Sequence, residues 1–262
     1  MKIITLSVLL CTMMFLTLVV NSQTIPTIQW EKSLGGSSND FGFQIHQVDG
    51  DGYITIGYSA SIDGDVTGNH GSYDYWVVRL DADENILWQK TLGGSEGEGA
   101  FSIQQITGGG FIVAGSSYSN DFDVSGNHGD MDYWIVRLDA AGNLIWQKSL
   151  GGTAADRANY IQQTFDGGFI VVGYVWSDDG DVSGFHGVHD AWVVKLDSNG
   201  TFVWQRSLGG TGEDEAKAVQ QTADNGYIIA GYSSSNDGDV SGNHGGADYW
   251  IVKLDENGDL EW

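Results

Sequence analysis

The sequence predicts an all-β protein, and within that class a β-propeller of four-stranded antiparallel blades. The first observation is an internal repeat of 58 residues, without insertion or deletion, marked by Trp30, Trp88, Trp146, Trp204 and Trp262. Periods of this length are typical of solenoids, propellers and other repeat arrays. The second observation is that no segment has helical periodicity and that the only proline is Pro26. We therefore divide the chain into the repeats 31–88, 89–146, 147–204 and 205–262.

Each repeat contains four predicted strands, as the first one illustrates. Residues 43–48 alternate between apolar and polar side chains, which is typical of a half-buried strand. Residues 53–58 and 75–80 are rich in β-branched and aromatic residues, and residues 86–92 supply the fourth strand. Asp and Gly at 49–52, and Asp and Asn at 81–85, are the residues that turns favour.

Such sheets bury both faces only by packing against one another, as propeller blades do. Glycine recurs inside every second strand, at 57, 115, 173 and 231, so we expect a backbone or a large ring to approach closely there. A linear β-solenoid is the main alternative fold, although its rungs are usually shorter and parallel. Residues 27–34 match a fourth strand, so the four repeats either close a ring or form part of a larger one.

The N-terminus predicts a secretory signal peptide over residues 1–22. Lys2 precedes a charge-free apolar run from Ile3 to Val20, and we expect cleavage before Gln23. A retained membrane anchor is the alternative, because the run is about long enough to span a bilayer. Cleavage leaves a propeller of residues 23–262 without cysteine, so neither disulfides nor thiol chemistry is expected.

The charge balance restricts the partners. The chain has 35 acidic and 11 basic residues, and its formal net charge of −24 would repel nucleic acid and anionic membrane surfaces. We expect no nucleic acid partner and no membrane insertion after signal cleavage. A hydrophobic content of 41% argues against disorder.

An acidic loop before the third strand of each repeat is the most specific chemical pattern. Oxygen-bearing side chains occupy positions 1, 3, 5 and 12, with glycine at position 6, which is the spacing of a calcium-binding loop. The loop departs from that pattern with Ser or Thr at position 5, Asp at 12 and His at 8. The alternative is that these residues simply form turns and cap their own backbone. The predicted calcium ligands are Asp63, Asp65, Thr67, Asp74, Asp121, Asp123, Ser125, Asp132, Asp179, Asp181, Ser183, Asp190, Asp237, Asp239, Ser241 and Asp248.

Other candidate residues are fewer. A second acid follows each Leu-Gly-Gly, and we expect it to cap backbone or to pair with a basic residue of the third strand; these acids are Asp40, Glu98, Asp156 and Asp214. Trp176 has no counterpart in the other repeats and is predicted to lie on a loop, so it is the candidate ligand-binding residue. Most other tryptophans are expected in the core.

The sequence favours a non-catalytic binding or scaffold module for a glycan or protein ligand. It lacks nucleophile-elbow, zinc-protease and phosphate-loop motifs. Four symmetry-related sets of acids suit cation binding better than an acid and base with distinct pKa values. The alternatives are an extracellular glycan-acting enzyme and a purely structural spacer.

The motifs W-x-K-[ST]-L-G-G, D-G-G-[FY]-I-[IV]-x-G-[YS] and D-[YA]-W-[VI]-V-[RK]-L-D resemble repeats of large secreted β-propeller proteins of Bacteroidetes and related bacteria. The resemblance covers residues 28–262. It implies an exported, extracellular or cell-surface bacterial module, of a kind often carrying a type IX secretion sorting domain. The motifs identify the repeat and not an activity.

Overall fold

A computed structural model describes residues 27–48 and 52–262 of the chain. Residues 1–33 and 34–262 form separate units, and every strand belongs to the second unit. The predicted signal peptide, residues 1–22, lies outside the described residues. No helix in the described part of the chain is long and apolar enough to cross a membrane.

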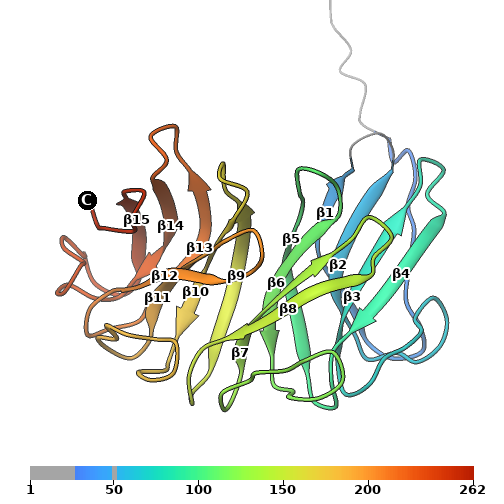
Figure 1. The fold of residues 1–262 in the computed structure, drawn as a ribbon, viewed down its shortest axis with the longest axis horizontal. Coiled ribbons are helices and arrows are strands. Elements are labelled where there is room, and N and C mark those ends of the chain that lie inside the picture. The colour runs from blue at the N-terminus through green and yellow to red at the C-terminus, as the bar shows by residue number, and fades with distance from the viewer. Residues whose placement is uncertain (1–26, 49–51) are drawn as a thin grey trace, which may run out of the picture. The chain divides into compact units, whose positions relative to one another are not determined.

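Residues 34–262 form four antiparallel sheets, one from each repeat (Figure 1). The first contains β1 (Asp40–Gln47), β2 (Tyr53–Ser59), β3 (Asp74–Leu80) and β4 (Ile86–Leu92). The second contains β5 (Glu98–Gln105), β6 (Phe111–Ser117), β7 (Asp132–Leu138) and β8 (Leu144–Leu150). The third contains β9 (Asp156–Gln163), β10 (Phe169–Val175), β11 (Asp190–Leu196) and β12 (Phe202–Leu208). The last contains β13 (Asp214–Gln221), β14 (Tyr227–Ser233) and β15 (Asp248–Leu254), and Leu260 adds a bridge to Leu254.

The strands confirm the predicted all-β class. Within each sheet every strand pairs antiparallel with the next one along the chain, which contradicts the parallel rungs of a solenoid. A register shift recurs in the first strand of each sheet, between Gly42 and Gln44 in β1 and between Ala100 and Ser102 in β5. A sheet runs from its first to its fourth strand, as from Asp40 to Leu92, so the physical unit is offset from the frame 31–88.

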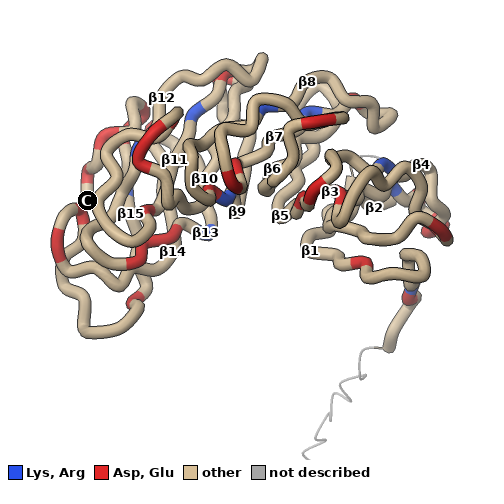
Figure 2. Tube along the Cα trace, turned by 90° about the horizontal axis from the view of Figure 1, so that it is seen from below, with Lys and Arg blue, Asp and Glu red and all other residues tan. Residues whose placement is uncertain are grey.

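Neighbouring sheets pack face to face through three apolar clusters. One cluster joins the first two sheets through residues such as Tyr75, Val77 and Trp134. Equivalent clusters join the second sheet to the third and the third to the last. No apolar cluster among the described residues joins the last sheet to the first. Figure 2 shows β1, β5, β9 and β13 toward one common side, with β4, β8 and β12 on the opposite side. Burial on both faces explains why β6 is buried throughout.

A tyrosine of the third strand forms a hydrogen bond to the next sheet, and a glycine of the second strand allows close packing. The Tyr75 hydroxyl donates to the Trp134 carbonyl at 2.9 Å, and Tyr133 donates to the Trp192 carbonyl at 3.2 Å. A Cβ on Gly115 would lie 2.0 Å from the neighbouring strand's backbone carbonyl oxygen and 2.6 Å from the Tyr75 hydroxyl. This confirms the expected reason for glycine in the second strand.

Candidate ligand-binding groove

The first two acids of each loop hold the Leu-Gly-Gly segment in place. Asp63 Oδ1 accepts the Ser37 amide at 2.7 Å, and Asp65 Oδ2 accepts the Gly35 amide at 3.1 Å. The Ser37 hydrogen bond is the main cause that lowers the pKa of Asp63. The same two contacts are made by the pairs Asp121 and Asp123, Asp179 and Asp181, and Asp237 and Asp239.

The remaining predicted calcium ligands bond to other partners. The Thr67 hydroxyl accepts from Gln89, whereas Asp74 Oδ2 accepts the His70 amide at 2.9 Å and lies 3.1 Å from His70 Nδ1. Ser125 and Ser183 repeat the glutamine contact, and Asp132, Asp190 and Asp248 repeat the histidine contact. Ser241 lies beside Asp248 in the lining of a hollow of about 330 Å³. Within residues 27–48 and 52–262, no three acidic, histidine or cysteine side chains are placed to hold one metal ion.

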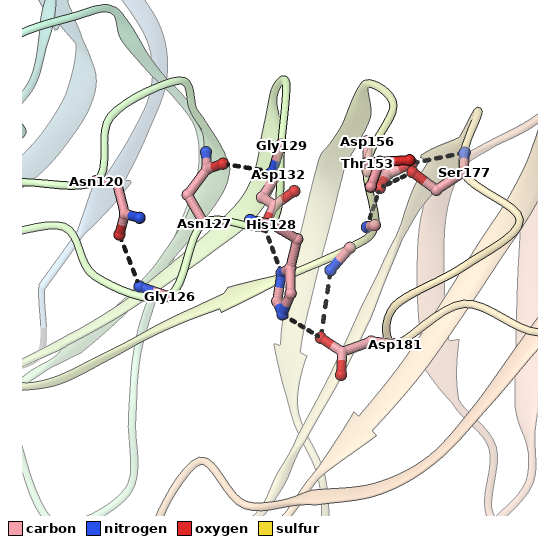
Figure 3. Close-up of polar contacts among 12 residues, drawn as sticks. Asn120, Gly126, Asn127, His128, Gly129, Asp132, Thr153, Asp156, Ser177 and Asp181 are labelled. Atoms are coloured by element: carbon pink, nitrogen blue, oxygen red, sulfur yellow. Dashed lines mark hydrogen bonds and ion pairs between the residues drawn. The ribbon is translucent and has the colours of Figure 1, made fainter.

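A buried carboxylate therefore stands at each junction between sheets. Asp132 is fully buried and its Oδ1 has no hydrogen-bond partner. Burial is the main cause that raises its pKa to about 6, the His128 contacts oppose the rise, and Asp156 adds to it. Figure 3 shows His128 reaching from this loop toward Asp181 of the next sheet, with 3.8 Å between Nε2 and Oδ2.

The second repeated acids cap backbone amides and do not reach the basic residues of the third strands. Asp156 Oδ2 accepts the Gly152 amide at 2.8 Å and the Ser177 hydroxyl at 2.7 Å. Asp40, Glu98 and Asp214 accept the matching amides of their own Gly-Gly segments. Lys195 pairs with Asp166 instead, so the capping alternative is the one the structure contains.

An aromatic groove is the best candidate for a ligand site. Its volume is about 460 Å³, and it lies beside the first strands of three sheets. Phe41 and Tyr58 face each other across the β1–β2 pair with ring centroids 5.1 Å apart, and Tyr73 lies 5.3 Å from Tyr58. Its lining also includes Phe101 from β5, Tyr118 and Tyr174.

Charged groups give the groove a polar end. The Arg157 guanidinium lies 4.0 Å above the centre of the Phe101 ring, a geometry that attracts a cation to the ring face. Glu98 also lines the groove, and burial is the main cause that raises its pKa. In the last sheet, Glu215 stands at the position of Arg157 and Lys217 at the position of Phe101, and these two residues form an ion pair.

Trp176 extends this surface. Its ring is half exposed and stacks on His189 with centroids 6.1 Å apart and planes 24° apart. His189 in turn lies 5.3 Å from Tyr174, which lines the groove. Both ring nitrogens of His189 are buried without a hydrogen-bond partner. The single residue chosen from the sequence therefore belongs to a larger set of rings.

The sequence contains a signal for this groove that motif reading misses. Groove positions differ between otherwise similar repeats: where the first has Phe41, the others have Gly99, Arg157 and Glu215. The column that contains Trp176 also contains Tyr118 and Ser234. A position that varies between otherwise identical repeats is not constrained by the packing that all repeats share. Comparing the four copies position by position would therefore have indicated the groove.

The groove combines aromatic faces with polar groups, an arrangement suited to contacts with a ligand. Flat apolar rings bordered by hydroxyl, guanidinium and carboxylate groups suit a ligand that has both apolar faces and polar edges. The acids of the junctions are held by backbone amides or histidine and are not paired across the groove.

Comparisons with known proteins do not assign a family. No protein-family model matches the chain. The regulatory protein FlaEY of Caulobacter vibrioides is 27% identical over 162 residues, which cover 58% of this chain and 17% of FlaEY. The chain thus matches less than a fifth of that relative's length.

Several solved structures have weak similarity to this chain. A eukaryotic initiation factor has a TM-score of 0.35 at 10% identity, with 84% of this chain and 54% of that chain covered. A mutant apocarotenoid oxygenase of Synechocystis has a TM-score of 0.38 at 14% identity, with 79% and 45% covered. A protein of unknown function from Bacteroides caccae has a TM-score of 0.21 at 11% identity, with 79% and 92% covered. Likenesses of this size carry no argument about activity.

Proposed function

We propose that this chain is a non-catalytic binding module of an exported bacterial β-propeller protein, and that its aromatic groove binds a glycan. The observation that carries the proposal is the concentration of aromatic side chains beside the first strands of three sheets, some of which, such as Phe41 and Tyr73, are not repeated in the other copies. Packing alone would favour the same residue in each copy, so the variation supports a role in recognition. The four sheets then act as blades that hold the rings in place.

The groove has features that a glycan needs. Sugar rings have flat apolar faces and hydroxyl edges, which match aromatic rings next to the Arg157 guanidinium. The formal charge of −24 favours neutral or cationic ligands over strongly anionic ones.

A glycan array followed by titration calorimetry tests the proposal. We expect Phe101→Ala and Trp176→Ala each to weaken binding about tenfold, which corresponds to about 1.4 kcal/mol. Phe165→Ala is the matched control, because this phenylalanine is exposed on a turn outside the groove. Absence of binding across the array, or equal affinity in all three variants, would show that the groove is not a glycan site. Turnover of any bound polysaccharide would overturn the non-catalytic part.

Export and calcium binding belong to the same proposal. Residues 1–22 support export, and fractionation of cells that express the full chain should place the mature protein outside the cytoplasm. The spacing of the acidic loops supports calcium stabilisation, with the carboxylate oxygens that the backbone does not use as ligands. A melting temperature several degrees higher in calcium than in chelator would support this role.

A further inference from the structure

Arg157 is the basic residue in the lining of the aromatic groove. It lies on β9, where it pairs with Tyr174 of β10, and both residues line the groove. The guanidinium carbon stands 4.0 Å from the centre of the Phe101 ring, so the ring covers one flat face of the guanidinium group. Stacking of this kind fixes the plane of the group and leaves its N–H edges available for hydrogen bonds.

No carboxylate of the protein neutralises this arginine. Within residues 27–48 and 52–262, Arg157 forms no ion pair with an acidic side chain. Its Nε is buried and has no hydrogen-bond partner. The neighbouring Tyr174 is neutral: burial raises the pKa of its hydroxyl, and Arg157 opposes that rise. With 35 acidic residues against 11 basic ones, the chain could easily have placed an acid beside this arginine.

The acids that do lie near the groove already have partners. Glu98 lines the groove but is only 3% exposed. Its Oε1 accepts the Ser117 hydroxyl at 2.7 Å, and its Oε2 accepts the Gly94 amide at 2.8 Å. Glu215, which acts electrostatically on Tyr174, forms an ion pair with Lys217. The charge of the Arg157 guanidinium is therefore left for a ligand.

This local charge decides the sign of the ligand that contacts the rings. A cationic ligand would compete with Arg157 for the face of Phe101 and would meet a like charge there. The formal charge of −24 is spread over the whole chain, and its field is screened beyond about 8 Å at about 0.15 M salt. It disfavours polyanions, whereas a single carboxylate in contact with Arg157 is attracted at close range.

We propose that the groove selects a glycan that contains a carboxylate-bearing sugar, such as a uronic acid, and that Arg157 is the residue that determines this specificity. The inference rests on the proposed glycan-binding function. The carboxylate accepts two parallel N–H bonds from one edge of the guanidinium group. The aromatic rings that line the groove contact the faces of the same sugar and its neighbours.

Titration calorimetry at about 0.15 M salt tests the specificity with a panel of matched oligosaccharide pairs. The two members of a pair differ only in that glucose replaces glucuronate. We expect the wild type to bind the acidic member about tenfold more tightly. Arg157→Gln should reduce this ratio to about one and leave the affinity for the neutral member within about twofold. Arg157→Lys keeps the charge but not the planar fork, so it should retain only part of the preference.

Arg137→Gln is the matched control, because it makes the same change in net charge. Arg137 lies on β7, is also partly buried with an unpartnered Nε, and is absent from the groove lining. This variant should keep the full preference for the acidic member. Far-ultraviolet circular dichroism of all three variants checks that they are folded.

The outcomes separate this inference from the proposed function. Equal affinity for both members of a pair, or a preference that survives Arg157→Gln, would overturn the inference and leave the groove as a glycan site. Tighter binding of a sulfated member than of the carboxylated one would overturn the assignment of a carboxylate. Failure of every acidic and neutral member to bind would remove the glycan-binding function and the inference together.

Discussion

Replacing Asp132 with asparagine should stabilise the protein at neutral pH. The carboxyl group is fully buried, Oδ1 has no hydrogen-bond partner, and burial raises its pKa from 3.8 to about 6. At about 1.36 kcal/mol for each unit of pKa, a difference of this size corresponds to roughly 3 kcal/mol. Solvent that reaches the loop reduces the effect, so we expect about 1 to 3 kcal/mol.

The direction of the pH dependence follows from whether the folded or the unfolded chain binds the Asp132 proton more tightly. The pKa of Asp132 is higher in the folded chain than in the unfolded chain, so folding favours the protonated carboxyl. This stabilisation is complete below the unfolded pKa of 3.8 and is lost as the pH rises through about 6. Asparagine is neutral at every pH and keeps an oxygen for His128, so the variant avoids the loss.

Urea unfolding followed by tryptophan fluorescence at pH 4.5, 6 and 7.5 measures the effect. The free energy of unfolding of the wild type should fall over this range, and that of Asp132→Asn should fall less. Asp130→Asn is the control, because Asp130 is exposed in the same loop. A variant that is less stable than the wild type at pH 7.5, or that has the same pH slope, would refute the reasoning.

The other predictions concern packing and the acidic loops. Tyr133→Phe removes the hydrogen bond to the Trp192 carbonyl and should cost about 1 kcal/mol of unfolding free energy, whereas Tyr118→Phe, at an exposed ring, should cost almost nothing. Gly115→Ala places a Cβ 2.0 Å from a backbone oxygen and should lower the melting temperature by many degrees or prevent folding, whereas Gly42→Ala meets nothing within 4 Å and should be tolerated. In calorimetry at matched ionic strength, calcium should raise the melting temperature more than magnesium if the loops coordinate it; equal effects would mean general screening.

The strands could be predicted from the sequence because their pattern is local. The predicted strand 75–80 is observed as Asp74–Leu80, and 86–92 is observed as Ile86–Leu92. β-branched and aromatic residues between turn-forming residues decide such boundaries without knowledge of the rest of the chain. The 58-residue period then required that the same unit occur four times.

The groove could be predicted only in part. Trp176 was identified because it is unrepeated, but its neighbour His189 lies at the other end of the same β10–β11 loop and is brought beside it by the pairing of Val175 with Asp190. Phe101 and Arg157 lie on first strands of different sheets, so no spacing within one repeat relates them. The partners of the acidic loops were missed for the same reason: Asp63 bonds Ser37, 26 residues earlier.

The sequence by itself determined the repeat, the antiparallel strands and the residues available for chemistry, because these depend on period, propensity and composition. The tertiary structure decided which faces are buried and which remain open. Tyr75 and Tyr249 occupy the same place in their repeats, yet one is fully buried and the other is 91% exposed. The physical reason is that burial depends on the neighbouring sheet, and no repeat contains information about whether a neighbour is present.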